Sequence, residues 1–83
     1  MPQEKHELIT IEITAGELDG MGLKPYYQMP RIGEWVEVAD DDGKALIFEV
    51  VMIAHSTGGG TADVYVKRLG DLASVVGSLL KGK

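Results

Sequence analysis

The sequence predicts a mainly β fold: a small antiparallel barrel of four to five strands with one C-terminal amphipathic helix. Apolar and polar residues alternate at period two in several short segments, which is typical of half-buried strands. Near the C-terminus the spacing changes to the three-and-four pattern of a helix. A chain of 83 residues has room for a single domain, 1–83, because domains usually comprise about 100–150 residues.

The first expected strand covers residues 8–14. Ile9, Ile11 and Ile13 share one face of it, and the residues between them share the other. Residues 15–33 contain four glycines and two prolines without a sustained period. We therefore expect a long connection there, extended close to its prolines because the residue before a proline avoids the helical region.

Two more strands, at residues 34–39 and 45–54, flank a predicted hairpin. The turn between them contains Asp42-Gly43, and glycine readily adopts the positive φ that a tight turn requires. Leu46, Phe48 and Val50 keep one phase along the later strand, whereas Ile53 falls in the opposite phase. We expect a bulge near Val51 to restore the register.

The last strand is expected at residues 62–69, where Val64 and Val66 face inward, and a helix is expected at 71–81. Asp71 is placed to cap the start of this helix. Burying one large aliphatic side chain contributes about 1.5–3 kcal/mol, so the apolar stripe should not remain in water. We expect the helix to cover an open end or side of the barrel, or to dock on a neighbouring molecule. The stripe comprises Leu72, Val75, Val76, Leu79 and Leu80.

Composition limits the function. The net charge of −5 is unfavourable for a protein that mainly neutralises a phosphate backbone. The absence of cysteine excludes disulfides, zinc–thiolate sites and thiol catalysis. No apolar run is long enough for a secretory signal or a membrane span, so we expect a cytoplasmic protein without membrane partners.

We expect no enzyme, no metal site and no cofactor. The glycines at 58–60 lead into a strand, whereas a phosphate-binding loop leads through Lys-Ser/Thr into a helix. His55 and Ser56 are adjacent on an extended chain and point apart, which hinders a nucleophilic pair. His6 and His55 lack a third metal ligand near them in the sequence. The acidic run at 40–42 lacks the alternating spacing of a calcium loop, so we interpret it as a solvated turn.

Two sets of residues are candidates for partner binding. The first set is the helix stripe, whose partner is another protein or a second copy of this chain. The second set is Tyr26, Tyr27, Met29 and Trp35, which form an apolar surface with polar tips if they meet there, although they could instead cover a barrel end. A different class of partner, single-stranded nucleic acid, would need the cationic strip Arg31, Lys67 and Arg68.

A family resemblance covers residues 30–69. Its elements are Pro30-Arg31-Ile32-Gly33-Glu34, the valines at 36 and 38, the Asp-Gly hairpin, Phe48-x-Val50-x-x-Ile53-x-His55 and Asp63-Val64-Tyr65-Val66. This pattern resembles small bacterial and phage proteins of unknown function with Src-homology-3-like (SH3-like) barrels. The resemblance implies a barrel and carries no activity. The expected function is a non-catalytic protein-interaction or self-association module; the alternative is a small barrel that binds single-stranded nucleic acid.

Overall fold

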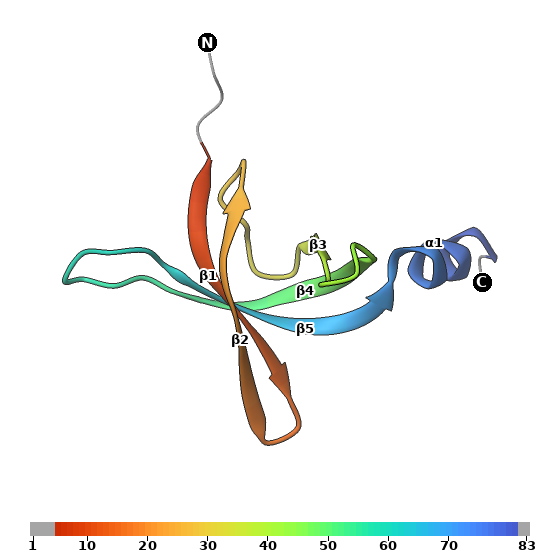
Figure 1. The fold of residues 1–83 in the computed structure, drawn as a ribbon, viewed down its shortest axis with the longest axis horizontal. Coiled ribbons are helices and arrows are strands. Elements are labelled where there is room, and N and C mark those ends of the chain that lie inside the picture. The colour runs from red at the N-terminus through yellow and green to blue at the C-terminus, as the bar shows by residue number, and fades with distance from the viewer. Residues whose placement is uncertain (1–4, 82–83) are drawn as a thin grey trace, which may run out of the picture.

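The computed structural model describes residues 5–81 and contains one curled sheet followed by one helix (Figure 1). The strands lie in the order β2-β1-β5-β4-β3. The elements are β1 (His6–Thr14), β2 (Glu17–Tyr26), β3 (Trp35–Ala39), β4 (Ala45–Ala54), β5 (Asp63–Asp71) and α1 (Leu72–Lys81). The predicted mainly β class with a C-terminal helix is confirmed, and the sheet curls into a half-barrel.

The prediction of a wholly antiparallel sheet is wrong, because β1 and β5 are parallel neighbours. The other three strand pairs are antiparallel. Strand β5 ends the β3–β4–β5 meander and lies between β4 and β1, so the first and last strands are neighbours in the middle of the sheet.

Strand β2 occupies a segment for which a connection was expected. It pairs only with β1, in a register that shifts between Thr10 and Ile11. Gly22 has a φ of 80°, and Pro25 lacks a backbone N–H. An edge strand tolerates both features because one side of it makes no hydrogen bonds within the sheet. These residues also erase the alternation that would have predicted a strand.

Strand β1 turns its isoleucines outward. Leu8, Thr10 and Glu12 are buried, whereas Ile9 is 37% exposed. Apolar residues of a half-buried strand normally face the core. Here the polar residues lie inside because each has a partner: the Thr10 and Tyr26 hydroxyls are 2.8 Å apart, and Glu12 accepts hydrogen bonds from the guanidinium of Arg68.

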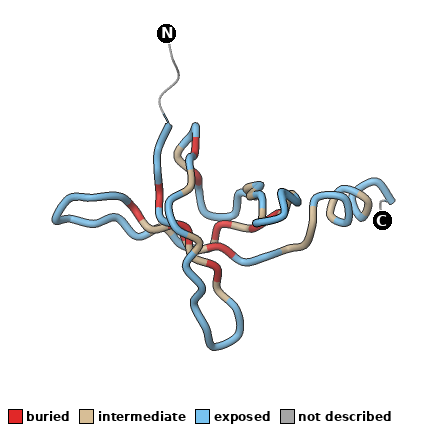
Figure 2. The backbone as a smooth tube through the Cα atoms, viewed as in Figure 1, coloured by how far each residue is buried: buried red, intermediate tan, exposed pale blue. Residues whose placement is uncertain are grey.

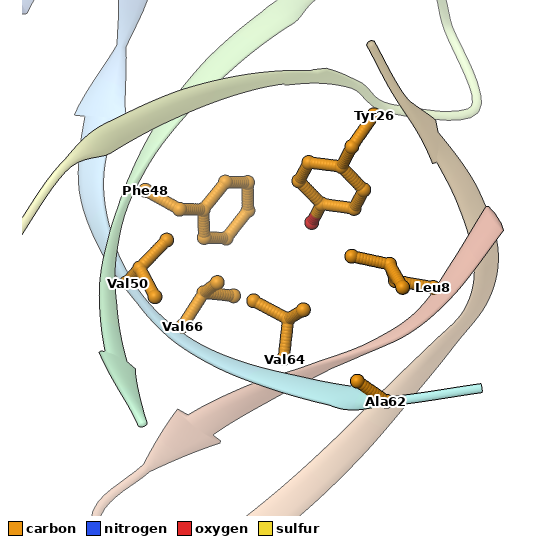
Figure 3. Close-up of a cluster of buried hydrophobic side chains, with 7 residues drawn as sticks. All are labelled: Leu8, Tyr26, Phe48, Val50, Ala62, Val64 and Val66. Atoms are coloured by element: carbon orange, nitrogen blue, oxygen red, sulfur yellow. The ribbon is translucent and has the colours of Figure 1, made fainter. Parts of the chain in front are cut away.

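Most buried residues lie near the middle of the molecule (Figure 2), and the curved strands surround the core side chains on the concave side of the sheet (Figure 3). Figure 3 shows Phe48 and Tyr26 facing the aliphatic side chains of the neighbouring strands. The predicted inward positions of Val64 and Val66 are confirmed, as is the register shift between Val50 and Met52. The shift allows Ile53 to pack against the same core. The core cluster is Leu8, Tyr26, Phe48, Val50, Ala62, Val64 and Val66.

The predicted hairpin turn between β3 and β4 is confirmed. Gly43 has a φ of 82° and donates its N–H to the carbonyl oxygen of Asp40. The Asp40 carboxylate accepts hydrogen bonds from the backbone N–H groups of Asp42 and Lys44, at 2.9 and 2.8 Å. This Asp40 oxygen therefore serves the turn itself.

Helix α1 begins where the sequence indicates but does not cover the barrel. The backbone N–H of Ser74 donates to the Asp71 carboxylate at 2.7 Å, which is an N-cap contact and lowers the pKa of Asp71. The helix extends beyond the end of β5, away from the crossing point of the strands (Figure 1). It contains no buried residue. The prediction that it would cover an end or side of its own barrel is therefore wrong.

Because the Tyr26 hydroxyl is buried, we expect the folded protein to lose stability in alkaline solution. Burial raises the pKa of this hydroxyl, and the hydrogen bond with Thr10 opposes that rise only in part. A raised pKa in the folded state means that the stabilising contribution is complete below the unfolded pKa, about 10, and is lost as the pH rises through the folded value. Urea denaturation of the wild type should therefore show a falling free energy of unfolding above pH 10.

The variant Tyr26→Phe should lose about 1 kcal/mol at neutral pH, because the hydrogen bond disappears, and should show a shallower alkaline decline. Tyr27→Phe is the matched control, because Tyr27 is exposed. An identical alkaline decline in the wild type and Tyr26→Phe would contradict the assignment. The lysines also titrate in this pH range, but they affect the wild type and both variants equally, so the difference between the curves reports on Tyr26.

Candidate interaction surface

The first turns of α1 contact the end of the β4–β5 ladder. Gly70 pairs with Ile47, which is buried outside the main core cluster. A Cβ added at Gly70 would lie 3.5 Å from Val75 Cγ2. Val75, one of the five predicted stripe residues, therefore packs on its own sheet.

The other four stripe residues are exposed. The exposed fractions are 36% for Leu72, 41% for Val76, 63% for Leu79 and 82% for Leu80. A ten-residue helix is too short to be stable by itself, because isolated helices below about 12–15 residues are marginal in water. We call these four residues the exposed stripe. An apolar stripe of this kind on a short helix is a candidate contact surface.

A second apolar surface lies on the convex side of the sheet. Ile11 is paired with Tyr65, which is paired in turn with Met52, and Ile9 is paired with Leu23. Directly paired residues point to the same face of a sheet. Leu23 is 55% exposed and Met52 is 45% exposed. We call these five residues the outer patch, which the inverted orientation of β1 creates.

The aromatic residues predicted to bind a partner do not share one surface. Tyr26 belongs to the core, and Met29 is half-buried against it. Tyr27 and Trp35 are both more than half exposed. Trp35 lies on the edge strand β3, where it is paired with Glu49 of β4.

The three residues predicted to form a cationic strip are also separated. Lys67 and Arg68 are consecutive on β5 and point to opposite faces. The Arg68 guanidinium donates two hydrogen bonds to Glu12, at 3.0 and 3.1 Å, and its Cζ lies 5.5 Å from the centroid of the Phe48 ring. Arg31 pairs with Glu34 in the connection before β3, at 3.9 Å. Two of the three cations therefore have carboxylate partners.

Arg68 was a predicted site residue, as part of the cationic strip, but its partner Glu12 was not, and the sequence did not predict their pairing. The pair borders a cavity of about 380 Å³ between β2 and the β3–β4 hairpin. The Glu12 side chain is only 8% exposed, whereas that of Arg68 is 49% exposed. The sequence contained one indication of this pair. Glu12 is a charged residue within β1, a strand whose alternating residues are isoleucines.

The motifs set aside at the sequence level lie at the periphery. The glycines at 58–60 are exposed between β4 and β5, and Gly59 and Gly60 have φ values of 100° and 92°. Within residues 5–81, no three His, Asp or Glu side chains are grouped as metal ligands would be. No helix in the same range has the length and apolar character needed to cross a bilayer.

Comparisons with protein-family models, curated proteins and solved structures find no match to this chain. The candidate surface is therefore assigned from geometry. It consists of the exposed stripe of α1 and the outer patch of the sheet, which together contain most of the large exposed aliphatic side chains outside the loops.

Removing the cation from the inner ion pair should destabilise the protein strongly. Arg68→Met would leave the Glu12 carboxylate buried without its partner, at a cost of about 3 kcal/mol. Lys67→Met is a matched control on the exposed face and should change the free energy of unfolding by less than about 0.5 kcal/mol. Urea denaturation at pH 7 measures both values.

The double variant Glu12→Gln/Arg68→Met should regain part of the loss, because it no longer buries an unpaired charge. Equal effects of Arg68→Met and Lys67→Met would show that the pair contributes no more than a surface contact.

Proposed function

We propose that this protein is a non-catalytic self-association module and that the exposed stripe of α1 is its contact surface. The observation that carries the proposal is a ten-residue helix without a buried residue, whose four exposed aliphatic side chains lie along one side. Such a helix gains most of its stability from packing an apolar face. Val75 provides some of this packing, against Gly70 of β5, and the four residues of the exposed stripe remain accessible.

The composition of α1 supports a contact with protein. Lys81 is its one charged residue, and the remainder is Leu, Val, Ala, Ser and Gly. Interface cores are depleted of charged residues in the same way. Transferring an exposed leucine to such a core contributes up to about 1.5–3 kcal/mol, so Leu79 and Leu80 are the strongest candidates for anchors.

The alternative function, binding of single-stranded nucleic acid, has weaker support. Arg68 is engaged by Glu12 on the concave side, and Lys67 lies on the opposite face. The net charge of −5 opposes a phosphate backbone. We therefore rank this alternative below self-association.

A relationship to SH3-like barrels is also proposed for residues 30–69. The β3–β4–β5 meander, with its Asp-Gly hairpin and bulged β4, supports it. The pairing of β1 with β5 and the helix lie outside the resemblance and are treated as properties of this chain alone.

Size-exclusion chromatography with light scattering tests self-association. The wild type should elute as an oligomer at micromolar concentration, and Leu79→Glu should elute as a monomer, because a charge cannot be buried in an apolar contact at low cost. Leu79 is 63% exposed in the isolated chain, so Leu79→Glu should keep the circular dichroism of the folded sheet.

Ser78→Glu is the matched control, since it adds the same charge to an exposed position on the other side of α1 and should leave the oligomer intact. A monomeric wild type would refute self-association. Equal dissociation by both glutamates would assign the effect to net charge and not to the stripe.

A further inference from the structure

The outer patch gives the exposed stripe a specific place to bind. It spans four neighbouring strands, from Leu23 on β2 through Ile9 and Ile11 on β1 and Tyr65 on β5 to Met52 on β4. Large apolar patches on a sheet face usually mark a contact surface. A helix laid across a sheet face is also a standard way to bury both apolar surfaces.

In its own chain α1 leads away from this patch. Leu72, its first residue, follows Asp71, the last residue of β5, without a linker. Tyr65 lies six positions before Asp71, or about 20 Å along an extended strand, whereas a helix of ten residues is about 15 Å long. Figure 1 shows α1 continuing beyond the end of β5, away from the centre of the sheet.

We infer that the exposed stripe of α1 packs on the outer patch of a second copy of this chain. This inference rests on the proposed self-association and specifies its geometry. Val75 packs on the helix's own sheet, and the exposed stripe on the rest of α1 remains accessible to a second copy. Reciprocal exchange between two copies is the smallest assembly that covers both surfaces in each of them.

Charge favours this contact over a pairing of two helices. Two antiparallel copies of α1 would bring Lys81 to Asp71 of the other helix. The Asp71 carboxylate already accepts the Ser74 N–H, at 2.7 Å, and lies 3.4 Å from Lys44 Nζ. The margin of the outer patch instead offers Asp63, which is paired with Ile9. Glu7, two positions before Ile9 on the same face of β1, is already paired with Lys5, whose Nζ lies 3.6 Å from its carboxylate.

Disulfide trapping tests the geometry without background, because the chain contains no cysteine. Leu79→Cys and Met52→Cys are prepared as separate proteins, one of them with a mass tag, then mixed and oxidised. We expect the mixed disulfide to be the dominant cross-link. The control is a mixture of Leu79→Cys with Asp42→Cys, which places the second thiol in the exposed β3–β4 turn. This mixture should give at least about tenfold less mixed disulfide.

The remaining outcomes separate the two levels of the proposal. Dominant Leu79→Cys homodimers would overturn the exchange but keep self-association through α1. A monomeric wild type together with an absence of cross-links would overturn both. As a second measurement, Met52→Lys should dissociate the oligomer as Leu79→Glu does and keep the folded circular dichroism; an intact Met52→Lys oligomer would overturn the role of the outer patch.

Discussion

The ion pair between Glu12 and Arg68 decides which face of β1 points inward. Side chains alternate along a strand, so burying Glu12 also buries Leu8 and Thr10 and turns the isoleucines of the strand outward. A buried carboxylate is tolerated only with a partner, and Arg68 provides a two-bond contact from the neighbouring strand β5. The apolar outer patch is thus a direct consequence of a polar contact inside the half-barrel.

The hydrogen bond between Thr10 and Tyr26 has the same role on the other side of β1. Tyr26 is the last residue of β2, and its ring reaches across the concave side toward Phe48 (Figure 3). It satisfies the buried Thr10 hydroxyl and supplies a large apolar surface to the core. The two polar contacts connect β1 to both of its neighbours, and within residues 5–81 no buried side-chain nitrogen or oxygen lacks a partner.

The parts of the fold that follow from local sequence could be predicted. The Asp-Gly turn, the phase change in β4, the inward valines of β5 and the Asp71 cap all depend on residues close together in the chain. The orientation of β1 could not be predicted, because Glu12 and its partner are 56 positions apart. Strand β2 was missed because its glycines and proline interrupt the alternation of apolar and polar residues by which a strand is recognised. The position of α1 was missed because an apolar stripe does not indicate which surface will cover it.

The parallel pairing of β1 with β5 also has a consequence for synthesis on the ribosome. Ile9 meets its partner Asp63 only after the intervening strands have been made. Without β5, strands β1 and β2 would be an isolated hairpin, and such hairpins are only marginally stable in water. Pairings between distant segments are intrinsically slow to form. The central pairing of the sheet therefore depends on the two ends of the chain coming together, and the outward isoleucines of β1 gain their neighbour Tyr65 only at that step.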